Sequence, residues 1–208
     1  MALIGLISDV HATPAPVAEA LSIFEQARVD QVFCAGDIAG YREQLDETVA
    51  LLIEGDCQTV MGNHDLGYLE KHVNGADKGA AEFLKQLPSS IDASIAGKQV
   101  YMVHAHPPND CRGGIKLLDK QGEVQPERIA LWREHLQTFD RDVLIVGHTH
   151  QVFAEQIGNT LVVNPGSSAF NHSCAILSLP EMTVQVFPLS GKAVVKNWIW
   201  SDHVMKRG

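Results

Sequence analysis

The stretch LIGLISDVHATPAPVAEALSIFEQAR, residues 3–28, contains the alternation that decides the fold. It begins with mostly apolar, branched residues, which predict a buried strand over residues 3–8. Thr13 is a candidate helix N-cap and Pro14 a suitable first helical residue, and apolar side chains then recur on one face at helical spacing. A strand followed at once by a helix that covers it is the unit of a layered α/β fold.

The same alternation continues along the chain. Apolar runs predict further strands at residues 31–35, 59–61, 99–103, 142–146 and 160–163. Amphipathic patterns predict further helices at residues 42–54, 78–86 and 126–139. After residue 143, short apolar runs alternate with turn residues, which indicates antiparallel hairpins. We therefore expect an α/β core whose second half is richer in antiparallel strands.

Length and composition set limits on the class of protein. A chain of 208 residues with 45% apolar residues is long enough for one buried core, so we expect a single domain over residues 1–208. A formal net charge of -9 argues against non-specific nucleic-acid binding, because that mode needs lysine and arginine to neutralise phosphates. The start lacks a signal-peptide pattern, no apolar run approaches the roughly 18 residues of a membrane span, and the cysteines lack paired spacing. A cytoplasmic location without a membrane partner is therefore expected.

Groups that bind metals or transfer protons follow several of the predicted strands. They are Asp9 and His11 after the first, Asp37 after the second, Asn63, His64 and Asp65 after the third, His104 and His106 after the fourth, and His148 and His150 after the fifth. In open α/β sheets, ligands bind in the crevice at the carboxyl ends of the strands. These clusters are therefore expected to converge on one site, with polar turns that satisfy local backbone groups as the alternative interpretation.

The kinds of ligand narrow the choice of metal. Carboxylates, imidazoles and an amide oxygen without thiolate suit manganese, iron, zinc, nickel or cobalt. Two carboxylates, four histidines and Asn63 are too many ligands for one ion with an open position, and they suit two divalent ions that share a carboxylate. Such a pair would attract a phosphate to an acidic protein. It would also lower the pKa of a bridging water from about 15.7 toward about 7, which supplies hydroxide at neutral pH.

The motifs together resemble those of a known family. In order they are DVH (9–11), GDIAGY (36–41), GNHD (62–65), VHAHP (103–107), and GHTH (147–150) followed by NPGS (164–167). The series resembles the ordered signature of the calcineurin-like metallophosphoesterase superfamily, and specifically its small single-domain phosphodiesterase-like branch. The match runs from Asp9 to Ser167, most of the chain. The resemblance implies an α/β fold, a four-layer αββα sandwich of two mixed β-sheets flanked by helices, known as the metallo-dependent phosphatase fold.

The resemblance also implies roles for residues of this chain. The first metal would be held by Asp9, His11 and His150, the second by Asn63, His104 and His148, with Asp37 bridging the two. His64 would protonate the leaving oxygen or steady the phosphate, with Asp65 orienting it. Chemistry alone also favours an imidazolium as the acid for an alkoxide near neutral pH. We leave His106 out of the metal set, because a supporting or exposed position is the simpler interpretation.

Two departures from the family pattern bear on the substrate. Many relatives have glycine after the histidine of the fourth strand, where this chain has Ala105; the metal ligand itself is intact. The protein-phosphatase branch has an Asp-Arg-Gly element after the second motif, and GDIAGYRE (36–43) has none. Protein dephosphorylation is therefore disfavoured.

The function expected from the sequence is hydrolysis of a phosphodiester bond by a dinuclear metal centre. Manganese is the first choice of metal, and a small phosphate ester, with nucleotides among the candidates, is the expected substrate. A phosphomonoesterase, a dinucleoside-polyphosphate hydrolase and a non-catalytic protein-binding scaffold of the same fold are the alternatives. Arg112, Lys116 and Lys120 lie in a long polar loop and are interpreted as solvated rather than as phosphate ligands. The apolar segment NWIW (197–200) leaves open whether the chain forms a homo-oligomer or covers its own sheet.

Overall fold

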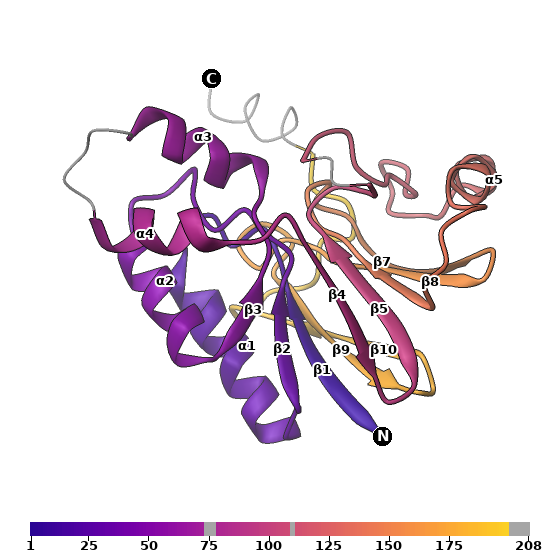
Figure 1. Ribbon diagram of the computed structural model, residues 1–208, viewed down its shortest axis with the longest axis horizontal. Coiled ribbons are helices and arrows are strands. Elements are labelled where there is room, and N and C mark those ends of the chain that lie inside the picture. Colours follow the sequence, from indigo (N-terminus) through magenta and orange to yellow (C-terminus); the bar gives the residue numbers. More distant parts are fainter. Residues whose placement is uncertain (73–77, 109–110, 200–208) are drawn as a thin grey trace.

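Two five-stranded β-sheets lie in the middle of the molecule, with helices on both outer sides (Figure 1). The computed structural model describes residues 1–72, 78–108 and 111–199. One side carries α1 (Pro14–Ala27), α2 (Leu45–Glu54), α3 (Asn63–Lys71) and α4 (Lys78–Gln86), and the other side carries α5 (Pro126–His135). The expected α/β class and the αββα sandwich of two mixed sheets are confirmed. None of these helices is long and apolar enough to cross a membrane.

Both sheets mix parallel and antiparallel neighbours. The first has the order β10-β9-β1-β2-β3, in which β1, β2 and β3 are parallel and β9 and β10 are antiparallel to their neighbours. Its strands are β1 (Ala2–Ile7), β2 (Gln31–Cys34), β3 (Cys57–Thr59), β9 (Ser173–Leu179) and β10 (Thr183–Pro188). The second has the order β4-β5-β6-β8-β7, in which β5, β6 and β8 are parallel and the edge strands are antiparallel. Its strands are β4 (Ser90–Ile95), β5 (Lys98–Val103), β6 (Val143–Ile145), β7 (Val152–Ile157) and β8 (Thr160–Pro165).

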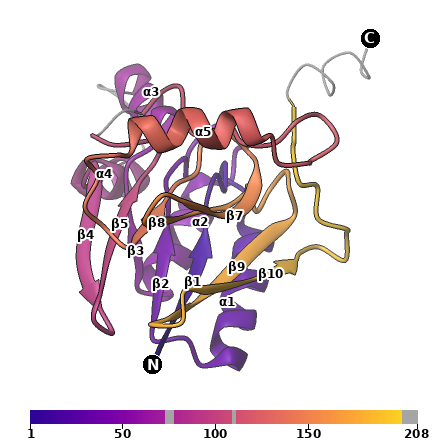
Figure 2. The same ribbon diagram turned by 90° about the vertical axis from the view of Figure 1, so that its right-hand side faces the viewer.

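Alternating side chains along the strands build apolar layers on both faces of each sheet. In β1, Ile4 and Leu6 pack between the two sheets, in the same cluster as Met102 and Val163. Ile7 of the same strand packs on the other face, in the cluster that holds α1 and α2. The outer face of the second sheet is covered by α5, which packs against the cluster that includes residues of β7 and β8, and by the buried residues of the loop before it (Figure 2). Strands covered on both faces are nearly continuous apolar runs, which explains why the sequence pattern finds them.

The strands that precede the candidate site residues direct them to the seam between the two sheets. β1, β2 and β3 run parallel in one sheet, and β5 and β6 run parallel in the other. Asp9, Asp37 and Asn63 come two, three and four residues after the ends of β1, β2 and β3. His104 and His148 come one and three residues after the ends of β5 and β6. The site is therefore assembled from loops of both sheets.

Several element boundaries differ from those expected from the sequence. α4 has the expected bounds, α2 begins at Leu45 rather than at residue 42, α5 ends at His135 rather than at residue 139, and β3 ends at residue 59 rather than 61. α3 was not predicted, because its first turn is made of the polar residues of the GNHD motif. β4 was not predicted either, although its apolar residues Ile91, Ala93 and Ile95 alternate with polar ones. This alternation is typical of a half-buried strand, and β4 is an edge strand of its sheet.

Candidate metal centre

Carboxylate and imidazole groups from both sheets meet at the seam in two adjoining sets. In each set the ligand atoms lie within 4.8 Å of one another; the first set is Asp9, His11 and His150, and the second is Asp37, His104 and His148. A third grouping of the same kind contains His11, Asp37 and His64, so it connects the two sets. The structure thus brings together residues that the sequence places at the ends of separate strands.

The first set is enclosed by the protein. His150 Nε2 lies 3.2 Å from Asp9 Oδ1 and 3.2 Å from His11 Nε2. His11 Nδ1 lies 3.1 Å from the carbonyl oxygen of Ala39, a contact that favours the ring proton on Nδ1. The Nε2 lone pair of His11 then faces the other two ligand atoms. Histidines that bind metals are commonly fixed in this way by a backbone carbonyl.

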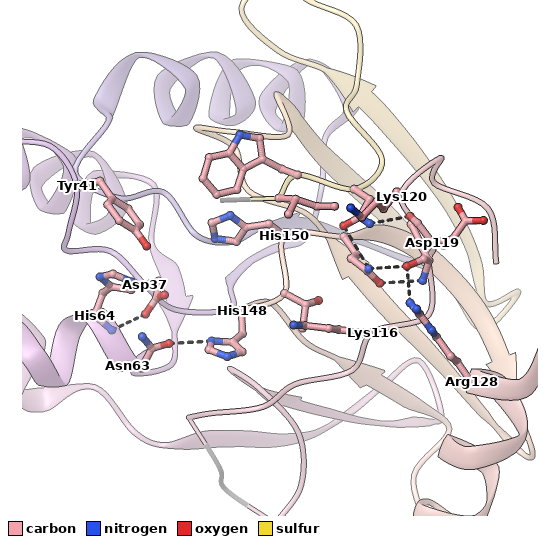
Figure 3. Close-up of a pocket in the computed structure, with 16 residues that line it drawn as sticks. Asp37, Tyr41, Asn63, His64, Lys116, Asp119, Lys120, Arg128, His148 and His150 are labelled. Atoms are coloured by element: carbon pink, nitrogen blue, oxygen red, sulfur yellow. Dashed lines mark hydrogen bonds between the residues drawn. The ribbon is translucent and has the colours of Figure 1, made fainter. Parts of the chain in front are cut away.

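The second set has the same design, with an added amide. His104 Nδ1 lies 2.7 Å from the carbonyl oxygen of Ala35, so its Nε2 faces Asp37 Oδ2 at 3.3 Å and Asn63 Oδ1 at 3.2 Å. Asn63 Oδ1 also lies 2.8 Å from His148 Nδ1 (Figure 3). The opposite orientation of the amide would donate N–H groups to both rings, so the inward Oδ1 is the orientation suited to a cation. This set of converging nitrogen and oxygen lone pairs fits a divalent transition-metal ion.

Asp37 contacts both sides of the site. Its Oδ2 faces His104, and its Oδ1 accepts a hydrogen bond of 2.8 Å from the backbone N–H of His64. The neighbouring chain approaches so closely that a Cβ at Gly62 would overlap the carboxylate and the backbone nitrogen of Asp37. A carboxylate in this position is suited to bridging two ions.

Five of the candidate ligands have backbone conformations in the left-handed region. Their φ angles are 49° at Asp9, 46° at His11, 55° at Asp37, 65° at His148 and 49° at His150. Conformations of this kind cost about 1–3 kcal/mol each in residues with a Cβ, and they cluster at functional sites. The surrounding structure must therefore hold these loops in place.

Buried polar side chains at the end of β8 and in the loop after it hold the ligand loops. Ser167 Oγ donates a hydrogen bond of 2.6 Å to the carbonyl oxygen of Asp9, and Asn171 Nδ2 donates one of 2.9 Å to the carbonyl oxygen of His150. Asn164 Nδ2 donates one of 2.9 Å to the carbonyl oxygen of Gly147. The NPGS motif drew attention to Asn164 and Ser167, whereas Asn171 was missed. Its bond to His150 crosses 21 residues of sequence, and no local pattern indicates it.

The electrostatics favour ionised carboxylates. Burial alone would raise the pKa of Asp9 and of Asp37, but neighbouring imidazoles hold both values below the usual range. Burial lowers the pKa of His11 and of His148 to about 4, which leaves both neutral at pH 7. Burial also acts to lower the pKa of His104, but the carboxylate of Asp37 raises it to about 9. A cation in the second set would displace that proton, since a bound histidine must be deprotonated.

His64 lies beside the two sets with its ring against other rings. The centroid of its ring is 5.0 Å from that of His11 and 4.6 Å from that of Tyr41. Its backbone nitrogen is at the first turn of α3, and its side chain lines the cleft over the site. The ring is therefore placed to meet a bound substrate.

Asp65 binds the backbone of the ligand loops. It is fully buried, and its two carboxylate oxygens accept hydrogen bonds of 2.8 Å from the backbone N–H groups of Ala39 and Gly62. Burial, with the nearby Asp37, raises its pKa to about 7. Its described hydrogen bonds involve no ring atom of His64. These hydrogen bonds connect Asp65 to His64 through the first turn of α3.

A cleft of about 610 Å³ opens over the candidate centre. Its lining at one end is Asp37, Asn63, His64, His148 and His150, and at the other end Lys116, Asp119, Lys120 and Arg128 (Figure 3). Lys116 and Lys120, which the sequence interpretation treated as solvated, thus line the cleft. The rings of Phe170 and Trp198 stack 4.4 Å apart beside His150 and form an aromatic wall.

Two further sequence expectations concern residues beside this cleft. His106 belongs to none of the potential metal groups among the described residues; its Nδ1 lies 2.8 Å from the carbonyl oxygen of Pro107 and its ring is near Trp132. In NWIW, Trp198 is buried beside His150, and Trp200 lies outside the described residues.

Comparisons with known proteins agree with this geometry. A curated relative, an uncharacterized protein of Methanocaldococcus jannaschii, is 27% identical over 180 residues, which are 79% of this chain and 69% of that protein. The solved structure of a metallophosphoesterase from Sphaerobacter thermophilus matches with a TM-score of 0.66 and 21% identity, covering 92% of this chain and 89% of that chain. A structure described as a novel archaeal phosphodiesterase matches with a TM-score of 0.58 and 20% identity, covering 90% of this chain and 99% of that chain. These structures share the fold.

The family model of the calcineurin-like phosphoesterase superfamily domain matches residues 2–181. This span is most of the chain and includes every candidate ligand. Metal-binding groups, fold and family model therefore point the same way, and the chain belongs to the calcineurin-like phosphoesterase superfamily.

Proposed function

We propose that this protein is a dinuclear metal-dependent phosphoesterase that hydrolyses a phosphodiester bond. The residues proposed to hold the two divalent cations are Asp9, His11 and His150 for one, Asn63, His104 and His148 for the other, and Asp37 between them. The observation that carries the proposal is the convergence of these lone pairs, from the ends of five strands, on two adjoining sets.

Two divalent cations bound there would activate a water molecule and neutralise charge on the phosphate. The chain supplies the electrostatic setting for this chemistry. Asp9 and Asp37 stay ionised because their pKa values are lowered. Two cations and these two carboxylates leave a site charge of about +2, which draws an anionic ester into an otherwise acidic protein.

His64 is proposed to give a proton to the leaving oxygen. Its backbone N–H is bonded to Asp37, and its ring lines the cleft. A positioned general acid of this kind contributes about 10²–10⁴-fold to the rate. Asp65 is proposed to position His64 indirectly, because its carboxylate ties the first turn of α3 to the backbone of Ala39.

The cleft supports a diester rather than a monoester. It continues well beyond the metal-binding sets, so there is room for a group on each side of the scissile phosphate. The archaeal phosphodiesterase of similar fold supports the same substrate class. Manganese is the proposed metal, with iron, nickel, zinc and cobalt as alternatives that accept the same oxygen and nitrogen ligands. The presence of all seven candidate ligands supports an enzyme over a non-catalytic scaffold.

The test is hydrolysis of bis(4-nitrophenyl) phosphate and of 4-nitrophenyl phosphate by chelator-treated protein, with manganese, iron, nickel, cobalt or zinc added back singly. The expected result is turnover that manganese restores, that is faster on the diester, and that the Asp37→Asn variant lacks. Turnover confined to the monoester would contradict the assignment as a phosphodiesterase and indicate a phosphomonoesterase. The protein could instead bind two ions but hydrolyse neither ester and no dinucleoside polyphosphate. That result would contradict the proposal and support a non-catalytic protein-binding scaffold.

A further inference from the structure

The cleft extends from the candidate metal centre to a second, cationic end. Its lining includes Lys116, Lys120 and Arg128, which lie on the side remote from His64 (Figure 3). A volume of about 610 Å³ is in the range of pockets that hold small organic ligands. The cleft therefore has room for more than the phosphate that is cleaved.

The loop that carries Lys116 and Lys120 is anchored by its own buried apolar residues. Lys116 and Lys120 are exposed, whereas Ile115, Leu117 and Leu118 between and beside them are buried in the core under the second sheet. The apolar residues hold this segment against the sheet, and the lysines are left on its cleft side. Because the backbone is already fixed, only the lysine side chains have to be ordered when a ligand binds, which lowers the entropy lost on binding.

A single buried glutamine links this loop to the metal-binding strand end. Gln151 directly follows His150, and its Oε1 accepts hydrogen bonds of 2.8 and 3.0 Å from the backbone N–H groups of Leu117 and Leu118. Its Nε2 donates a bond of 3.0 Å to the carbonyl oxygen of Leu118. Arg128 Nη1 donates one of 2.6 Å to the same carbonyl, so the guanidinium is held at this end as well. The cationic end and the metal centre are therefore parts of one framework.

The cationic end of the cleft carries a net positive charge, whereas the whole protein carries a net negative charge. Asp119 also lines it, but its carboxylate is already engaged. Oδ1 accepts bonds of 2.9 Å from the N–H groups of Gln121 and Glu123, and Oδ2 accepts one of 2.9 Å from Gln125 Nε2. Three cations and one anion give this end a net charge of +2 in a chain of net charge -9. Local positive charge in a cleft attracts anions even when the protein as a whole is acidic.

We propose that Lys116, Lys120 and Arg128 form a second phosphate-binding subsite, so that the substrate is a diester that carries a further phosphate group. This inference rests on the proposed function, since it assigns the scissile phosphate to the metal centre. The three cations select substrates by binding and take no part in bond cleavage. Lysine and arginine bind phosphate through charge-assisted hydrogen bonds, which is the chemistry this end offers.

A matched pair of substrates tests the subsite. One is the 4-nitrophenyl ester of thymidine 5′-phosphate, and the other is the same compound with an added 3′-phosphate, so that both release the same leaving group. The manganese-loaded protein is expected to hydrolyse the ester with the 3′-phosphate with a kcat/KM about tenfold or more above that of the other ester. A preference of this size corresponds to one or two charge-assisted hydrogen bonds. Lys116→Gln, Lys120→Gln and Arg128→Gln should each lower this preference, and the triple variant should bring it close to unity. Lys85→Gln, an exposed lysine of α4 on the other side of the molecule, is the control and should keep the full preference.

Equilibrium binding separates failure of the subsite from failure of the proposed function. Thymidine 3′,5′-bisphosphate and thymidine 5′-monophosphate are titrated into wild-type protein and the triple variant by calorimetry. Tighter binding of the bisphosphate by wild type alone supports the subsite, even if neither ester is hydrolysed. Equal hydrolysis of both esters, together with equal affinity for both nucleotides, would overturn the proposed subsite. The proposed phosphodiesterase activity would still be supported. An equal loss on both esters in Lys116→Gln would assign that lysine to the scissile phosphate instead and overturn its role here.

Discussion

Substitution of Gly62 by alanine tests whether the close approach at Asp37 is needed for the site. Gly62 has φ of -103°, which alanine adopts readily, so the cost is steric rather than conformational. A Cβ would overlap the carboxylate and the backbone nitrogen of Asp37. The backbone nitrogen cannot turn aside as a flexible side chain would, so the loop that carries Asp37 must shift. Overpacking of this kind costs about 1–3 kcal/mol, or roughly 2–12 °C in Tm for a chain of this size.

The matched control is Gly67→Ala, in the second turn of the same helix. A Cβ there would meet nothing within 4 Å, so the change should stabilise α3 by about 0.5–1 kcal/mol. Thermal unfolding followed by circular dichroism gives both Tm values, and elemental analysis after dialysis gives the bound manganese. Gly62→Ala is expected to lower both, with metal affinity reduced at least about tenfold, and Gly67→Ala to keep the metal. Equal Tm and full metal content in Gly62→Ala would refute the argument that this contact positions Asp37.

Three further perturbations follow from the same geometry. Asp37→Asn should lose bound metal and lower turnover by more than about 100-fold, since it removes the carboxylate shared by both sets; metal content and kcat measured together check this. His64→Gln should keep the metal but lose about 10²–10⁴-fold in kcat, most severely with poor leaving groups; a loss that is equal for aryl and alkyl leaving groups would argue against an acid. Chelator-treated protein should lose stability as the pH falls from about 6.5 to 4. His11 and His148 have pKa values lowered to about 4 in the folded protein, so the unfolded chain binds protons first over this range; a Tm that does not fall across it would contradict these shifts.

The sequence predicts the buried parts of the fold best. The helix at residues 78–86 has a helical apolar pattern, and the strands at the sheet centres are nearly continuous apolar runs, because packing on the core requires both. α3 was missed because its first turn serves the site, although Asp65, three residues after Gly62, bonds to the N–H of Gly62 as a helix N3 acid does and could have indicated its start.

The candidate site could be listed from the sequence, but not its supporting contacts. Carbonyl oxygens of Ala35 and Ala39 face His104 and His11 across 69 and 28 residues of sequence, and only the packing of the two sheets brings them together. The same holds for Lys116, whose position on the cleft depends on its loop being held by Gln151. A polar loop has the same composition whether it is solvated or anchored. Because loops generally run over the protein surface, composition alone favours the solvated interpretation.

The proposed function requires two metal ions, one on each side of Asp37. Crystals of the protein grown with manganese, with diffraction data collected above and below the manganese absorption edge, test it most directly. Two anomalous peaks are expected roughly 3.5–4 Å apart, one within the Asp9, His11 and His150 set and one within the Asn63, His104 and His148 set. A single peak, or peaks only elsewhere on the chain, would contradict it.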